Sequence, residues 1–212
     1  MNQNSIKNSN DNSFSVYYIK RVFRSIRPHI MCENLLNYGQ DRGTVIREMR
    51  INYVFATPET WEKIELACDE LGWSKASILK QMIHGFMAVD GVFYARAGIL
   101  DAKARGMSEE DYFRALRDGS DEDLARYIAG RPAFGKAPID DIDLISSTDE
   151  YKHRYNVIGL SAYSYVLLRV AQIVDGGAMV QVVSRMLVKH LQDKWQSNYQ
   201  LQIDRDKRCK FL

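Results

Sequence analysis

The sequence predicts a mainly helical protein with two short strands, and three observations support this fold class. A strand followed by two amphipathic helices occurs near the middle of the chain. The same order of elements recurs near the C-terminus, and the segment between the two is rich in helix-start signals. The 212 residues can bury a core, and 46% hydrophobic with 26% charged residues is typical of an ordinary globular protein.

The first strand-helix-helix unit is expected at residues 49–89. Its strand, RINYVFA, is rich in β-branched and aromatic residues. Thr57 followed by Pro58 indicates a helix start, Gly72 ends that helix, and Ser74 caps a second one. Apolar residues recur at helical spacing and give each helix one core-facing stripe: Trp61, Ile64, Cys68 and Leu71, then Ile78, Leu79, Met82, Ile83 and Phe86.

The second unit is expected at residues 151–193 and repeats the first at an offset of 104 residues without a gap. RYNVIGL is the strand, Ser161 to Asp175 the first helix, Gly176-Gly177 the turn, and Ala178 to Leu191 the second helix. Few residues are identical, but the turn and both apolar stripes keep their positions, which a chance alignment would rarely do. A lone unit cannot bury its apolar faces, whereas two copies can.

The remaining segments differ in charge and in expected order. Residues 1–13 are Asn/Ser-rich and expected to be disordered, and residues 14–48 form a basic extension. Residues 90–150 are an acidic helical insert and linker, with helix starts at Ser108 and Ser120 and a loop from Arg131 to about Thr148. A basic tail is expected at residues 194–212. The insert from Gly91 to Glu150 has a net charge of −5, although the whole chain is only +2.

Composition also narrows the location and the chemistry. Cys32, Cys68 and Cys209 lie far apart and leave one thiol over from any single disulfide, which favours a reducing cytoplasm. No apolar run reaches the roughly 20 residues of a membrane span. The histidines show no metal-ligand spacing and no nucleophile-base pattern is visible, so we expect no metal, no cofactor and no enzymatic activity.

The two units resemble the ribbon-helix-helix family, the superfamily of the Arc and Met repressors. RINYVFATPETWEKIELACDELGWSKASILKQMIHGFM is similar to it along its whole length, and the second copy is a more divergent match. The resemblance implies that the two strands pair antiparallel. The expected fold is therefore mainly α with a short two-stranded antiparallel β-ribbon, a tandem ribbon-helix-helix pseudo-dimer with a helical insert.

The resemblance also implies that the ribbon enters the DNA major groove, where alternate strand side chains contact bases. If Ile51, Tyr53 and Phe55 face the core, the outward residues are Arg50, Asn52 and Val54, and in the second strand Arg154, Asn156 and Ile158. Arg suits guanine, Asn suits adenine, and an apolar tip suits a thymine methyl. A register shifted by one would instead place Val54 and Ile158 in the core; the repeated Arg and Asn favour the first register.

Phosphate contacts are implied at the start of each second helix, where free amides and the helix dipole favour an anion. The residues there are Trp73, Ser74 and Lys75 in the first unit, and Gly177 and Ala178 in the second. The second set lacks a cation, so we expect an asymmetric target. Upstream, a stretch without acids could follow the DNA backbone as an arm through Lys20, Arg21, Arg24 and Arg27.

The leading hypothesis is a prokaryotic, sequence-specific transcriptional regulator such as a repressor, cytoplasmic and nucleoid-associated, that binds double-stranded DNA. A monomer acting as a pseudo-dimer, a homodimer, and higher-order assembly on DNA all remain open. One alternative is an accessory factor for conjugation, replication or partition of a mobile element. Another is an antitoxin or adaptor module that binds a protein through the acidic insert.

Overall fold

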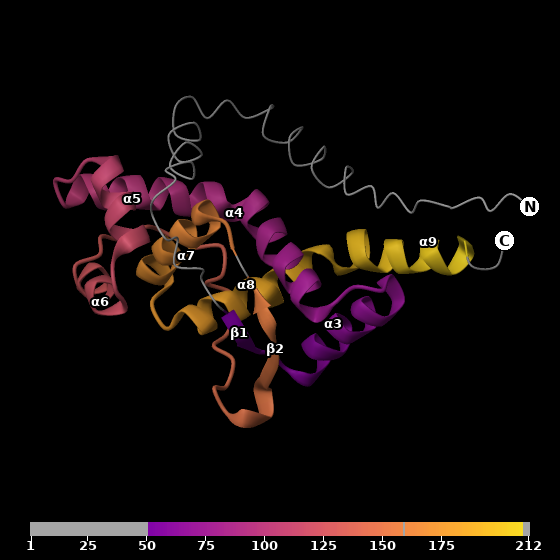
Figure 1. The fold of residues 1–212 in the computed structure, drawn as a ribbon. Coiled ribbons are helices and arrows are strands. Elements are labelled where there is room, and N and C mark those ends of the chain that lie inside the picture. Colours follow the sequence, from indigo (N-terminus) through magenta and orange to yellow (C-terminus); the bar gives the residue numbers. More distant parts are fainter. Residues whose placement is uncertain (1–50, 159, 210–212) are drawn as a thin grey trace, which may run out of the picture. The chain divides into compact units, whose positions relative to one another are not determined.

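The computed structural model describes residues 51–158 and 160–209, without the side chains of 155–158 and 208–209. Contacts divide the chain into two units, Met1–Gly43 and Thr44–Leu212, and all described residues belong to the second. The structure confirms that the chain is mainly helical and contains a two-stranded antiparallel sheet. The elements in order are β1 (Ile51–Phe55), α3 (Pro58–Leu71), α4 (Lys75–Ala104), α5 (Glu109–Asp118), α6 (Asp121–Ala129), η2 (Asp149–Tyr151), β2 (Lys152–Ile158), α7 (Ala162–Asp175), α8 (Met179–Lys194), the π-helical η3 (Trp195–Gln200) and α9 (Leu201–Cys209) (Figure 1).

Helix starts lie where the sequence predicts them. The hydroxyl of the residue before the helix accepts a hydrogen bond from the third helical amide in α3, α4, α5, α6 and α7; the caps are Thr57, Ser74, Ser108, Ser120 and Ser161. Such a cap contributes about 1 kcal/mol of stability. Gly72 ends α3 with a left-handed backbone, φ 65°, which glycine adopts without steric cost.

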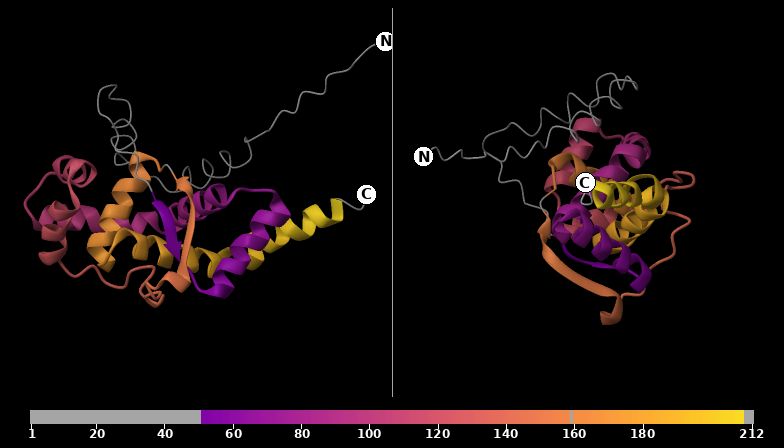
Figure 2. Two further views of the ribbon diagram at one scale, coloured as in Figure 1. Left: turned by 60° about the horizontal axis from the view of Figure 1, so that its bottom comes forward. Right: turned by 90° about the vertical axis from the view of Figure 1, so that its right-hand side faces the viewer.

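Each strand packs against a helix from the other half of the chain. β1 lies against α8, β2 lies against α4, and α4 also packs along both α7 and α8. Figure 1 and the two views of Figure 2 place the ribbon on the outside of these helices, with β1 and β2 side by side. The predicted apolar stripe of α4 is buried, and its Ile78, Leu79, Met82 and Ile83 are each 0% exposed. The core is therefore built jointly by the two halves.

Helix α4 is longer than the sequence predicts, because it continues past residue 89 to Ala104 without a break. Its neighbours approach closely at two glycines. A Cβ on Gly85 would lie 2.5 Å from Cε1 of His190, and one on Gly98 would lie 2.8 Å from Cε1 of Phe113. A larger residue at either position would force the facing ring to shift, since real Cβ atoms do not approach so closely. The predicted unit and its insert consequently share one continuous helix.

The C-terminal segment is helical through Cys209, where the sequence predicts a tail from residue 194. Trp195, Tyr199 and Ile203 are buried, and Lys207 forms an ion pair with Glu70 of α3 at 2.8 Å. The spacing of four between the apolar residues places them on one side, which explains the packing. Of the helices described, none is by itself both long and apolar enough to cross a membrane; α7 with residues 179–207, bent by 96°, meets that test only as a joined pair.

Residues 131–148 form the predicted loop, and α8 holds it in place. Arg185, 8% exposed, donates from Nε to the carbonyl of Ile142 at 2.8 Å and from Nη2 to that of Ile139 at 2.6 Å. Gln181 donates to the carbonyl of Ile145 at 2.9 Å. The same loop buries its isoleucines, so it covers part of α8 before the chain enters β2.

Two polar pairs lie inside the helical body. His190 is 6% exposed and hydrogen-bonds through Nε2 with the Tyr199 hydroxyl at 3.1 Å, and burial lowers the pKa of His190 to about 4. The chain stays helical beyond α8, and the buried residues that follow cover His190. Tyr94 donates to Asp175 at 3.0 Å, and burial raises the pKa of this carboxyl to about 6.

Candidate nucleic-acid interface

The pairing register separates the two faces of the ribbon. Tyr53 lies opposite Arg154, and Val54 lies opposite His153. Residues directly opposite in an antiparallel pair point to the same face, and neighbours along a strand point to opposite faces. Nζ of Lys152 lies 4.5 Å from the centre of the Tyr53 ring, which places it on the same face as that ring. Tyr53, Lys152 and Arg154 thus form one face, named here the outer face.

The opposite, inner face is closed by the helices. Val54 is 0% exposed, and the ring of His153 stacks on Trp61 of α3 with centroids 4.0 Å apart. His153 also hydrogen-bonds with the carbonyl of Ala56 at 3.3 Å, and burial lowers its pKa. The amide of Phe55 donates to the hydroxyl of Ser184 in α8 at 2.9 Å, which ties the end of β1 to that helix.

The buried Val54 corrects the expectation that this residue faces outward. The predicted register holds at the start of β1, where Ile51 is 3% exposed and Asn52 is exposed. An irregularity between Ile51 and Tyr53 shifts the pairing. A bulge of this kind re-aims the side chains that follow it. Tyr53 accordingly lies on the outer face and Val54 is turned inward. The alternative register therefore holds for Val54, whereas Phe55, at 8% exposed, is buried as the first register expects.

Polar groups line the exposed side of the ribbon. Asn52 and Arg154 are exposed, and Tyr53 and Lys152 are half-buried. Within the part of the chain that the structure describes, the Arg154 side chain has no hydrogen-bond or ion-pair partner. The edge of Tyr53 meets the Phe55 ring at a centroid distance of 5.7 Å. This face offers cations, an amide and a phenol, which are groups that can bind phosphates and base edges.

Several predicted residues lie outside the described part. Arg50 and the basic-arm residues Lys20, Arg21, Arg24 and Arg27 precede it. Asn156 and Ile158 belong to β2 by their backbone, and Ile158 is paired with Ile51, but their side chains are among those not described. Of the six predicted base-contacting residues, Asn52 and Arg154 are therefore the two seen on the exposed surface.

The predicted phosphate residues of the first unit lie at the start of α4. Ser74 caps the helix by accepting from the amide of Ser77 at 3.2 Å, and Trp73 is half-buried, with its amide directed to the carbonyl of Cys68. Lys75 points back toward α3 and forms a 2.6 Å ion pair with Glu65. The side chains of this pair are 42% and 44% exposed, so the ion pair lies partly open to solvent.

Glu65 joins a cluster that the sequence does not predict. Its carboxylate also accepts from Nε1 of Trp61 at 3.0 Å, and Nζ of Lys75 lies 5.1 Å from the centre of the Trp61 ring. The hydrogen bond from Lys75 lowers the pKa of Glu65. Since His153 stacks on Trp61, the cluster links β2 to the start of α4. The spacing of four between Trp61 and Glu65 is the one signal that the sequence offers for it.

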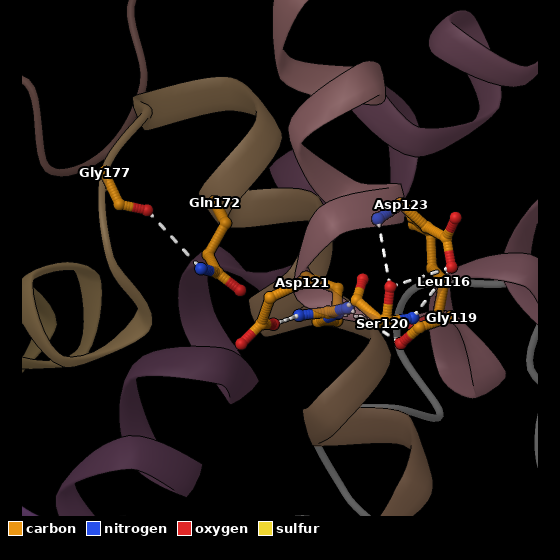
Figure 3. A network of polar contacts seen from close by, with 8 residues as sticks. Leu116, Gly119, Ser120, Asp121, Asp123, Gln172 and Gly177 are labelled. Carbon is orange, nitrogen blue, oxygen red and sulfur yellow. Dashed lines mark hydrogen bonds and ion pairs between the residues drawn. The ribbon is translucent and has the colours of Figure 1, made fainter.

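The turn before α8 is built differently. Gly177 and Ala178 are exposed, and Ala178 occupies the cap position without a side-chain hydrogen bond. Gln172 donates to the carbonyl of Gly177 at 3.4 Å, as Figure 3 shows. Nη1 of Arg131 donates to the carbonyl of Ile173 at 2.9 Å and also to that of the next residue. A cation near this turn thus comes from the insert rather than from α8.

Arg169 fixes the insert to α7. It is 3% exposed, and it donates to the carbonyls of Gly119 at 3.0 Å and Ser120 at 2.8 Å while pairing with Asp121. Figure 3 shows these residues gathered with Leu116, whose carbonyl accepts from Nε of the same arginine. The guanidinium fills the junction between α5 and α6 with charge-assisted hydrogen bonds, which are the stronger kind.

No family model matches the chain, and neither the curated proteins nor the solved structures include a significantly similar one.

Proposed function

We propose that the chain is a sequence-specific DNA-binding regulator that places the β1/β2 ribbon in the major groove. The observation that carries the proposal is the crossed packing, in which each strand lies against the second helix of the other half of the chain. An intertwined core of this kind is what the resemblance to ribbon-helix-helix proteins implies for two units. On this proposal one chain supplies both units, and the monomer takes the place of a dimer.

The register of the ribbon supports a two-fold relation between the units. Ile51 pairs with Ile158 and Tyr53 with Arg154, so Asn52 lies opposite residues 155–157. The offset of 104 relates Asn52 to Asn156, a residue of that same stretch. Two equivalent strands paired antiparallel bring equivalent residues face to face at their symmetry axis. The helix starts support the same relation, since the N-cap residues Thr57 and Ser161 are also 104 residues apart.

The proposed contact surface is the outer face together with Asn52. Arg154 can donate two hydrogen bonds to guanine, and the amide of Asn52 can pair with adenine. On this proposal Lys152 binds a phosphate at the groove edge. Val54 is not among the proposed contacts, because its side chain is buried between the ribbon and the helices.

The two ends of the site differ, which supports an asymmetric target. Beside the first turn the nearby cation is Lys75 in α4, and beside the second it is Arg131 from the insert. The second turn has no hydroxyl cap. We therefore expect the two half-sites to be protected unequally.

The test is selection of duplexes from a randomised library by the purified full chain, followed by binding of the selected duplex to two variants. Arg154→Ala is expected to weaken binding by about 1–3 kcal/mol, and to relax the preference at one base position. The matched control is Arg126→Ala, an arginine whose side chain is 83% exposed, in helix α6, which lies away from the ribbon (Figure 1). Enrichment of no sequence, or equal losses in the two variants, would count against the proposal.

A further inference from the structure

The Glu65 carboxylate forms an ion pair with Lys75, a cation that the proposed DNA site needs. Lys75 is the basic residue of the predicted phosphate contact at the start of α4, and its ammonium group lies 2.6 Å from Glu65. The pair bridges α3 and α4, ten residues apart in the sequence. A phosphate reaching this helix start would meet a carboxylate beside the ammonium group and would have to displace it.

Trp61 fixes the position of this carboxylate. Its indole Nε1 donates to the same Oε1 atom of Glu65 that accepts from Lys75, at 3.0 Å. The indole itself is held, since it is 8% exposed and stacked against His153 of the ribbon. An exposed ion pair alone is weak because its side chains are free to separate. The indole N–H anchors one member, so the carboxylate remains near Lys75.

We propose that Glu65 is a positioning residue that restrains DNA binding by holding Lys75 in an internal ion pair. The affinity for DNA is then lower than it would be with Lys75 free to bind a phosphate. The inference rests on the function proposed above. Phosphate binding releases Lys75 from Glu65, and the remaining carboxylate then repels the phosphate. The restraint thus limits sequence-independent binding, which depends on phosphate contacts, more than the reading of bases.

The test measures how tightly the selected duplex binds to the wild-type full chain and to the Glu65→Gln variant. The amide keeps an oxygen that can accept from Trp61, so the fold is preserved while the charge is removed. We expect the variant to bind about two- to fivefold tighter, the range that follows from the usual strength of an exposed ion pair. The dependence of log K on log salt concentration should steepen by about one.

Glu59→Gln is the matched control. It removes the same charge from the same helix, and Glu59 is likewise paired to a lysine, Lys63, at 2.7 Å. It should change affinity less than Glu65→Gln does. Thermal unfolding of each variant confirms that it is folded.

A second comparison tests whether Glu65 acts through Lys75. In a chain already carrying Lys75→Gln, Glu65→Gln should bring a clearly smaller gain, because only the repulsion between the carboxylate and the phosphate is left to remove. An equal gain in that background, or equal gains from the two glutamate variants, would overturn the inference and leave the proposed function intact. If no variant binds any duplex, both the inference and the proposed function fail.

Discussion

Replacing His190 with glutamine should alter how the stability of the protein depends on pH. The folded state holds this side chain neutral, with its pKa lowered from 6.5 to about 4, chiefly by burial. Below the ordinary pKa the unfolded chain takes up a proton that the folded chain refuses, so stability is lost as pH falls from about 6.5 to about 4. On going from about pH 8 to about pH 5, proton uptake by His190 in the unfolded chain lowers the free energy of unfolding by about 2 kcal/mol.

Asp175 acts in the opposite direction. Burial raises the pKa of its carboxyl from 3.8 to about 6, so stability is gained as the pH falls through about 6. Over the same interval this group adds about 1 kcal/mol, which offsets part of the loss from His190. The wild type alone therefore does not isolate the histidine, whereas a comparison of two proteins that share Asp175 does.

The assay is urea unfolding of the wild type and His190→Gln at about pH 8 and about pH 5. Glutamine can still hydrogen-bond with Tyr199 but has no proton to take up. The difference in stability between the two proteins should shift by about 2 kcal/mol in favour of the variant at the lower pH. A difference that is the same at both pH values would refute the assignment of His190 as a buried neutral group.

Two further predictions concern the ribbon and the insert. Val54→Ala should lower the free energy of unfolding by about 2 kcal/mol, whereas Asn52→Ala should change it by less than about 0.5 kcal/mol, as measured by thermal unfolding; equal effects would contradict the observed register. Arg169→Met should cost about 3 kcal/mol, since it leaves buried carbonyls unpaired, and should expose the junction near residues 119–121 to proteases. An unchanged cleavage rate there would show that this arginine does not hold the insert.

Local signals predict much of this fold because each is decided within a few residues. Thr57, Ser74 and Ser161 are followed by helical patterns, and a hydroxyl cap needs a partner only three residues ahead. Gly72 ends α3 through its own left-handed backbone conformation, which needs no distant partner. The helix starts and turns could therefore be placed without knowledge of the tertiary structure.

The face of a strand is harder to predict, since it depends on what lies beside it. Residues 53–56 are all apolar, so period-two alternation does not distinguish Tyr53 and Phe55 from Val54 as the inward residues. The irregularity after Ile51 depends on pairing with a strand about 100 residues away. For this reason the sequence alone predicts the wrong orientation for Val54.

The long-range polar contacts had no sequence signal. Arg169 and Arg185 bind backbone carbonyls 43 or more residues away, and a carbonyl is present at every residue. The C-terminal helix is different, because Trp195, Tyr199 and Ile203 repeat every four residues; that pattern could have indicated packing, but the charged DRDKRCK beside it suggested a tail.

The most direct test of the central proposal is to find which groove of the DNA the ribbon enters. Guanines of a selected duplex are methylated at N7, which blocks the major groove, and adenines at N3, which blocks the minor groove. We predict that guanine N7 methylation within the site prevents binding by the wild type and has less effect on Arg154→Ala. Interference from adenine N3 alone, or from neither position, would contradict recognition through a β-ribbon in the major groove.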